Sequence, residues 1–226
     1  INVMKKLQKA IPDFYGKEDI TFHELNSDFI ATFDLFLKTE AGLCRNTIVR
    51  YMKCFKRITN MALAKEWMRK DPFYGYKMAQ DETDPVFLTY PELKSIMEKE
   101  FTIPRLALVR DIFVFAAFTG LAFANVSTLT KDNLVQDNNG DWWIRKGRVK
   151  LERRHRASSV CNIPLLPVPL AILKKYEEHP ICRKKSLCLP VICNQRMNSY
   201  LKEIADLCNI RKNLTTHTAK HSKIYI

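Results

Sequence analysis

Apolar side chains recur at the helical period in two stretches of the first third of the chain. The run Asn26–Asp28 is suited to cap a helix that Gly42 ends. A longer helix is predicted from Arg45 to about Trp67, because apolar positions follow one another there at close to the 3.6-residue period. The apolar positions of the two helices are Phe29, Phe33, Phe36, Leu37, Ile48, Met52, Phe55, Thr59 and Ala62. The pattern predicts a small helical unit over residues 1–79.

A polar and acidic stretch follows this unit. Residues 80–86 begin Gln-Asp-Glu-Thr-Asp-Pro, a composition typical of a linker, and a second unit is expected over residues 87–226. Thr89–Glu92 has the form of a capping box with proline in the first turn, and residues 105–119 predict a mostly apolar helix that ends at Gly120.

Two segments of the second unit have the character of strands. Trp142–Ile144 and residues 158–163 flank a basic stretch and predict a small sheet or hairpin. Further helices are expected at about residues 170–177 and 194–208. The predicted fold class is therefore mainly α with a small β-sheet or hairpin.

The long helix of the first unit has a cationic side opposite its apolar side. At about 100° per residue, Arg50, Lys53 and Arg57 fall close together on that side. The sequence has no acidic residue between Arg45 and Lys65. Such a stripe is often only a solvated face. The net charge of +13 favours a nucleic-acid partner here, because phosphates that bind cations release counterions.

The densest basic segment runs from Arg145 to Arg156. Seven of its twelve residues are Lys or Arg and one is acidic. Mutual repulsion makes such an arm costly unless an anion binds it, so a hairpin that grips phosphates is the functional interpretation and an exposed loop the alternative. Any lysine in the arm could also protonate a leaving oxygen that it approaches.

The second candidate constellation is His217-Thr218-Ala219-Lys220-His221. Residues at i, i+3 and i+4 share a helix face, so His217, Lys220 and His221 are able to converge on one ligand. A cation beside imidazoles suits a phosphoryl transition state, in which negative charge builds on the non-bridging oxygens. A zinc site is a weaker interpretation, because the pattern lacks the glutamate and a third ligand. A polar helix end without function is the remaining alternative.

Other classes of protein find little support in the sequence. No run of about 18 apolar residues is present, and the phosphate-loop, dinucleotide-binding and serine-hydrolase motifs are missing. The seven cysteines contain no Cys-x-x-Cys pair, which favours reduced thiols and a cytoplasmic location.

Several short motifs occur in order along the chain. They are Asn46-Thr47, Asn60-Met61-Ala62, Asp71-Pro72-Phe73, Phe87-Leu88-Thr89, Arg110-Asp111-Ile112-Phe113, Phe118-Thr119-Gly120-Leu121, Asn162-Ile163-Pro164-Leu165, Asn194–Asn198 and His217–His221. Taken together they resemble the tyrosine recombinases, or phage integrase family, and most closely the integrases of conjugative transposons and related mobile elements. The resemblance implies a helical, SAM-like core-binding domain followed by part of a catalytic domain.

The resemblance also implies a reaction. Members of this family cut one DNA strand by attack of a tyrosine hydroxyl on phosphorus, keep the energy in a 3′-phosphotyrosine bond, and rejoin the strand to a second end. The reaction needs neither a metal nor another cofactor. The partner is double-stranded DNA, on which the full-length proteins act as tetramers at paired sites.

Site residues follow from the positions that match the family. Lys150 matches the general acid of the hairpin, with Lys146 as the second candidate, and His217 and His221 match the histidine box. Lys220 stands where the family has its second arginine, which removes a bidentate phosphate contact. Ala122 stands where the family has its first arginine, and Arg110 is the proposed replacement. The residues expected to contact DNA are Arg45, Asn46, Thr47, Arg50, Lys53, Arg57, Arg148, Arg153 and Arg154.

The nucleophile is not among the matched residues. In the family it follows the histidine box farther along than Ile226, and Tyr225 is too close to the box to serve. These departures leave an alternative open, a non-catalytic DNA-binding protein derived from a recombinase. An RNA-binding protein is a third interpretation, which the lack of an aromatic-rich RNA-binding pattern disfavours.

Overall fold

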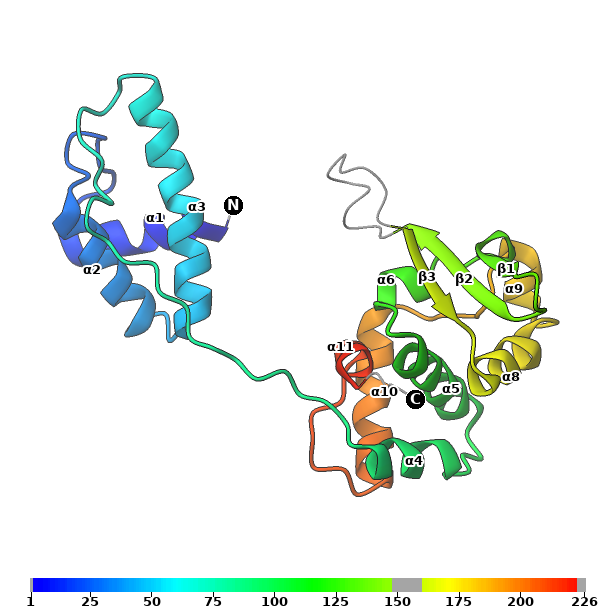
Figure 1. Cartoon of the computed structure of the whole chain (residues 1–226). Coiled ribbons are helices and arrows are strands. Elements are labelled where there is room, and N and C mark those ends of the chain that lie inside the picture. Colours follow the sequence, from blue (N-terminus) through cyan, green and yellow to red (C-terminus); the bar gives the residue numbers. More distant parts are fainter. Residues whose placement is uncertain (1, 148–159, 223–226) are drawn as a thin grey trace. The chain divides into compact units, whose positions relative to one another are not determined.

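The computed structural model describes residues 2–147 and 160–222 and divides into two compact units, residues 1–83 and 84–226 (Figure 1). Four residues predicted for the site, Arg148, Lys150, Arg153 and Arg154, lie outside the described residues.

The first unit contains the helices α1 (Asn2–Tyr15), α2 (Ser27–Lys38) and α3 (Arg45–Ala64). The predicted cap of α2 is present, because the Asn26 side chain accepts a hydrogen bond of 2.9 Å from the backbone N–H of Phe29. Gly42 follows α2 with a φ of 58°, a left-handed conformation that costs glycine little.

Phenylalanines form the core of this unit. Phe29 and Phe33 from α2 pack edge-on against Phe55 from α3, with ring centroids 6.2 and 5.7 Å apart. The Phe73 ring also packs edge-on against Phe55, with the ring centroids 5.5 Å apart. Helix α1 adds Val3, Leu7, Ala10 and Ile11 to the same core. The apolar positions predicted for α2 and α3 are all buried.

The second unit begins with three helices, α4 (Tyr90–Glu98), α5 (Pro104–Thr119) and α6 (Phe123–Val126). A short 3₁₀ helix η1 (Lys131–Asn133) leads into the strands β1 (Leu134–Gln136), β2 (Trp142–Gly147) and β3 (Val160–Pro164). Four helices follow, namely α8 (Pro167–Tyr176), α9 (Pro180–Lys185), α10 (Asn194–Leu207) and α11 (Thr216–His221).

The sheet is antiparallel, in the order β1-β2-β3. Ile144 on β2 is opposite Leu134 on β1 and Ile163 on β3, so apolar side chains line up across the sheet. Strand β2 extends into the predicted basic segment, because Arg145, Lys146 and Gly147 pair with Asn162, Cys161 and Val160 of β3. This arrangement confirms the predicted fold class, although β1 and α9 were not anticipated.

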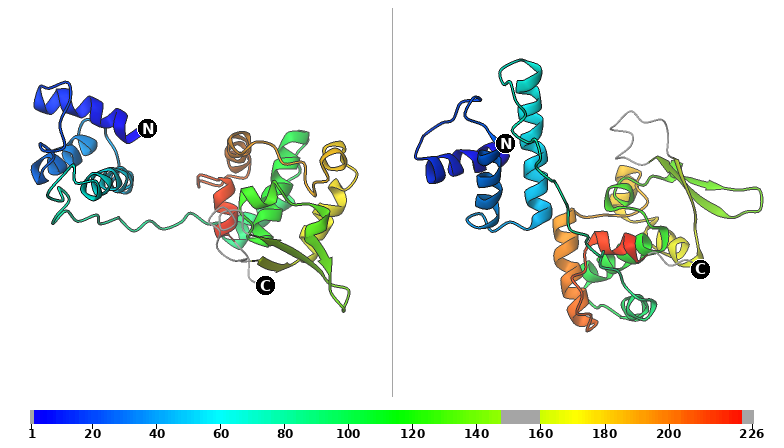
Figure 2. Two further views of the ribbon diagram at one scale, coloured as in Figure 1. Left: turned by 90° about the horizontal axis from the view of Figure 1, so that it is seen from above. Right: turned by 60° about the vertical axis from the view of Figure 1, so that its left-hand side comes forward.

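Helix α5 lies at the centre of the second unit, and α4, α8, α10 and α11 pack against it (Figure 2). Its one acid, Asp111, is only 5% exposed. The Asp111 carboxylate accepts hydrogen bonds from Arg110 Nε at 2.5 Å, Lys175 Nζ at 2.7 Å and the Tyr176 hydroxyl at 2.8 Å. Burial, followed by the bond to Asp111, raises the pKa of Tyr176, which keeps the hydroxyl protonated as a donor.

Within the described residues, no helix is both long and apolar enough to cross a membrane. In the same part of the chain, no three side chains of His, Cys, Asp or Glu gather as metal ligands. All seven cysteines are free thiols.

We predict that Asp111→Ala lowers the free energy of unfolding of the second unit by about 3–5 kcal/mol, because it leaves the Arg110 charge and the Tyr176 hydroxyl without their buried acceptor. Urea denaturation of the 226-residue chain measures this loss. Lys175→Ala is the control, because its side chain is 52% exposed and its loss should cost less than about 1 kcal/mol. Equal losses in the two variants would contradict this account of Asp111.

We also predict that limited proteolysis of the free chain cuts first within residues 80–86, the polar connection between the units. Residues 82–86 are exposed and have no regular secondary structure, so a protease can bind them without unfolding either core. A first cut inside α3 would show that the units do not fold independently.

Candidate nucleic-acid interface and active site

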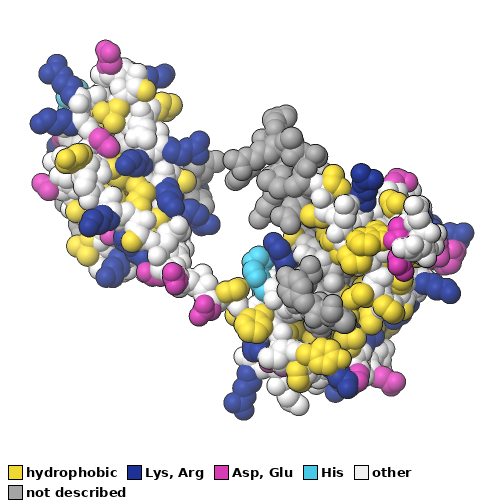
Figure 3. Space-filling view, viewed as in Figure 1, with side chains coloured by type: hydrophobic (Ala, Val, Ile, Leu, Met, Phe, Trp, Pro, Cys, Tyr) yellow, Lys and Arg dark blue, Asp and Glu magenta, His cyan; other side chains and the backbone are white. Residues whose placement is uncertain are grey.

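The cationic side of α3 is exposed as the sequence predicts. Arg50, Lys53 and Arg57 are all exposed, whereas Met52 and Phe55 between them are buried in the phenylalanine core. Lysine and arginine side chains are spread over the visible face of the first unit (Figure 3). The helix is rigid on its core side, so these cations have a fixed spacing along one surface.

The polar side chains at the start of α3 bond to the segment that follows the helical core. Arg45 pairs with Asp34 at 3.3 Å and donates to the carbonyl oxygens of Lys77 and Ala79, both at 3.2 Å. Asn46 exchanges two hydrogen bonds with the backbone of Asp81, at 3.0 and 2.9 Å. These side chains hold residues 77–81 against the helix. Their predicted DNA contacts are not tested by the structure, and their present bonds are internal.

Three further polar contacts involve residues of α3 or residues bonded near its start. Lys53 Nζ donates to Gln80 Oε1 at 3.1 Å, and Thr47 Oγ1 lies 3.2 Å from Cys44 Sγ. The Tyr76 hydroxyl donates to Asp34 Oδ1 at 2.5 Å. Burial and this bond raise the pKa of Tyr76 to about 12. Of the predicted contact residues that the structure describes, Arg50 and Arg57 are therefore the most available to an external partner.

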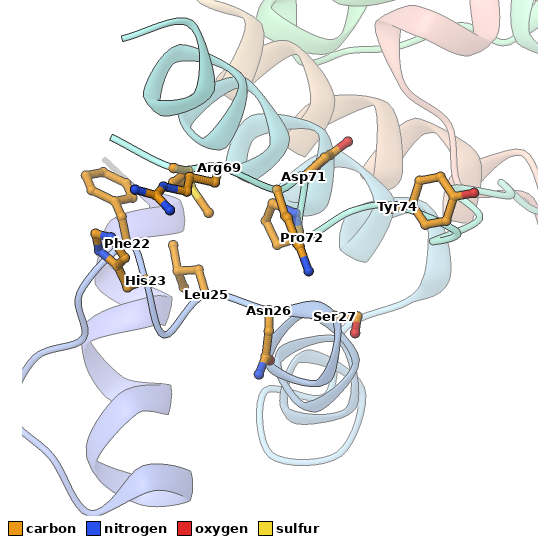
Figure 4. Close-up of a pocket in the computed structure, with 11 residues that line it drawn as sticks. Phe22, His23, Leu25, Asn26, Ser27, Arg69, Asp71, Pro72 and Tyr74 are labelled. Atoms are coloured by element: carbon orange, nitrogen blue, oxygen red, sulfur yellow. The ribbon is translucent and has the colours of Figure 1, made fainter. Parts of the chain in front are cut away.

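An open pocket of about 600 Å³ lies elsewhere in the first unit, beside the residues that follow α3 (Figure 4). Its lining combines rings and cations, including Phe22, Tyr74, His23, Arg69 and Lys70. None of the residues predicted to contact DNA lines it, so we do not assign it to the site.

Helix α11 carries the histidine box. His217, Lys220 and His221 are all exposed, while Thr218 and Ala219 between them are buried. The Nε2 atoms of His217 and His221 lie 3.1 Å apart, and the two rings meet edge to face at 85°. The structure therefore brings the two predicted histidines together on one exposed face, with Lys220 on the same helix.

Polar contacts fix the start of α11. Thr215 and Thr218 form a reciprocal capping box, and the backbone N–H of Thr216 donates to Asn198 Oδ1 at 2.9 Å. The Thr216 hydroxyl donates to Asn194 Oδ1 at 2.8 Å. The two asparagines come from the first turns of α10 and belong to the Asn194–Asn198 motif, but their bonds to α11 were not predicted from the sequence. The Thr215 and Thr218 spacing is the one signal that could have indicated this helix start.

The two candidate lysines of the hairpin differ in what the structure shows. Lys146 lies in β2, and its ammonium donates to the carbonyl oxygen of Thr128 at 2.6 Å and to Asn133 Oδ1 at 3.0 Å. These bonds hold Lys146 against the loop before η1. Lys150 lies outside the described residues, so its role remains a prediction.

Arg110 is bonded to the end of α4 and to its neighbour Asp111. Besides the pair with Asp111, its guanidinium donates to the carbonyl oxygens of Met97 at 3.0 Å and Lys99 at 2.9 Å, at the end of α4. These bonds satisfy helix-end carbonyls that would otherwise lack a donor. No contact in the described part of the chain joins Arg110 to His217 or His221, so the proposed site leaves it out. Ala122 is the N-cap of α6 and offers no side-chain donor.

Part of the sequence matches a known protein family. Residues 1–78 match the family described as "Phage integrase SAM-like domain". No curated protein matches the chain in sequence.

Solved structures resemble the whole chain. A lambda integrase dimer bound to a core site aligns with a TM-score of 0.72 at 14% identity, covering 98% of this chain and 76% of that one. The XerH site-specific recombinase bound to a palindromic difH substrate aligns with a TM-score of 0.66 at 16% identity, covering 97% of this chain and 65% of that one. The Tn1549 transposon integrase in complex with DNA aligns at 0.66 and 16%, covering 97% and 77%. At such identities the likeness shows the fold alone, and this fold is the one that the resemblance noted in the sequence implies.

We predict that the chain binds duplex DNA with a log–log salt slope near −5, as expected for about six phosphate contacts. Arg50→Glu should weaken binding to all sequences alike and reduce the slope by about 1, because phosphate contacts carry no sequence information. Titrations at several salt concentrations measure both effects.

The control for that titration is Arg183→Glu, which makes the same change in net charge. Arg183 lies on α9 in the second unit and pairs with Glu178 at 3.1 Å, far along the chain from α3. If Arg183→Glu weakens binding as much as Arg50→Glu does, total charge rather than the α3 face accounts for the affinity.

Proposed function

We propose that the chain is the DNA-binding and part of the catalytic portion of a tyrosine-type site-specific DNA recombinase. The observation that carries the proposal is the fold: α3 with its cationic face and α11 with its paired histidines occur in a chain that aligns over almost its whole length with integrases and a recombinase. The lambda integrase is bound to a core site, XerH to a difH substrate and the Tn1549 integrase to a circular intermediate DNA, which supports double-stranded DNA as the partner here.

In the proposed reaction, the α3 face binds phosphates and positions the duplex, and α11 stabilises the phosphoryl transition state. His217 and His221 supply N–H donors, and Lys220 supplies a positive charge. A lysine neutralises a phosphate oxygen as a point charge, without the two parallel bonds that an arginine makes. Lys150 is the proposed general acid, which protonates the departing 5′-oxygen as a tyrosine hydroxyl attacks phosphorus. We assign no residue to the attacking tyrosine.

A second candidate function is a DNA-binding protein that has lost cleavage activity. Two observations favour it: Ala122 has no donor, and Arg110 is engaged at the end of α4. This function shares the α3 interface and differs only in the chemistry, so a cleavage assay separates the two.

We predict that in the protein at its full natural length, Lys150→Ala slows strand cleavage by about 10²–10⁴, because a general acid is lost. A substrate with sulfur in place of the 5′-oxygen needs no proton on its leaving group and should restore the rate. The assay follows the covalent protein–DNA product on a denaturing gel with both substrates.

The matched variant for this assay is Lys146→Ala. The Lys146 ammonium is bonded within the unit, so its loss should not be rescued selectively by the sulfur substrate. Absence of any covalent product with either substrate, from a protein that still binds DNA, would favour the non-catalytic alternative.

A further inference from the structure

Helix α11 is too short to be stable on its own. It has six residues, whereas isolated helices shorter than about 12 residues are marginal in water. The orientation of His217 and His221 therefore depends on the contacts that hold this helix at its two ends and along its buried side. The contacts at its start, from Asn194 and Asn198, belong to the site described above.

The end of α11 is held by a buried serine. The Ser222 hydroxyl donates to the carbonyl oxygen of Thr218 at 2.8 Å, within the last turn of the helix. The same hydroxyl oxygen accepts a hydrogen bond of 2.7 Å from the backbone N–H of Leu88. Ser222 is 4% exposed and Leu88 is 5% exposed, so water cannot readily replace either bond.

Leu88 belongs to the segment by which the chain enters the second unit. It lies between Phe87 and Thr89, the N-cap of α4. Lys212, in the loop before α11, donates to the Phe87 carbonyl oxygen at 3.1 Å and to Glu92 at 2.6 Å. Burial acts to raise the pKa of Glu92, but the bonds from Lys212 and Thr89 hold it below its ordinary value. Residues 87–89 are thus bonded both to the loop before α11 and to the residue that ends it.

We propose that Ser222 is a positioning residue, which fixes the histidine face of α11 by tying the end of that helix to the backbone at Leu88. The relevance of this tie to DNA cleavage rests on the proposed function. The structural effect of the bond does not depend on that function. Through the Ser222 hydroxyl, a change in residues 87–89 reaches the turn of α11 that carries His221. Ser222 approaches no substrate in this role and acts only through the helix.

The test uses the 226-residue chain and two NMR readouts, amide hydrogen exchange and the imidazole resonances of His217 and His221. In the wild type, the Leu88 amide should be protected from exchange although it precedes α4. Ser222→Ala should accelerate its exchange roughly three- to tenfold, the loss expected for one net hydrogen bond. The same change should shift the resonances of both histidines, because the last turn of α11 loses its fixed end.

Two variants complete the experiment. Ser222→Thr keeps the hydroxyl and should restore both readouts toward wild type. Ser95→Ala is the matched control, because among the described residues the Ser95 hydroxyl donates only to the Glu92 carbonyl oxygen of its own helix, at 2.8 Å, and its side chain is exposed. It should leave the histidine resonances unchanged.

Unchanged histidine resonances in a folded Ser222→Ala variant would overturn the proposal. If that variant does not fold, an unprotected Leu88 amide in the wild type overturns it equally. Neither readout involves cleavage of DNA. If Ser222→Ala shifts the histidine resonances but the full-length protein does not cleave DNA, the role of Ser222 stands and the proposed function falls. If the full-length protein cleaves DNA but the resonances do not shift, the proposed function stands and the role of Ser222 falls.

Discussion

Helix α5 is apolar around most of its circumference, and burying it is the constraint on which the second unit depends. Its buried side chains include Leu106, Val109, Ile112, Phe113 and Phe115. Each side chain of this kind contributes about 1.5–3 kcal/mol when it leaves water, far more than the propensity of any short helix packed on it. Helices α4, α8, α10 and α11 therefore occupy the sides of α5, and the position of the histidines follows from that packing.

The same burial explains how the first unit accommodates its charge. Like charges on one helix face cost a few tenths of a kcal/mol per pair, whereas each phenylalanine of the core contributes about 1.5–3 kcal/mol. Helix α3 therefore stays folded with Arg50, Lys53 and Arg57 exposed on one side and no acid among them. A stable core side and a cationic side therefore occur on one element.

Polar side chains at the ends of helices decide how the two elements of the site are held. Arg45 and Asn46 fix residues 77–81 to the start of α3, and Ser222 fixes Leu88 to the end of α11. The residues on each side of the connection are thus bonded within their own unit. Arg45 and Asn46 lie on α3 with the proposed DNA-binding residues, and Ser222 directly follows α11, which carries the proposed catalytic histidines. Arg110 is a similar case, because its Nη1 donates to two carbonyl oxygens at the end of α4.

The sequence by itself determined α2, α3, α5 and the β2–β3 pair, together with the cationic face and the histidine face. Caps, helical periods and strand character depend on neighbours within a few residues, so they can be read without a fold. Tertiary structure decided the partners of Arg45, Arg110 and Ser222, and it added β1 and α9, which are too short to show a period. The bond between Leu88 and Ser222 joins residues 134 positions apart. Such a bond exists only because packing on α5 brings the two segments together, and no local pattern in the sequence encodes that approach.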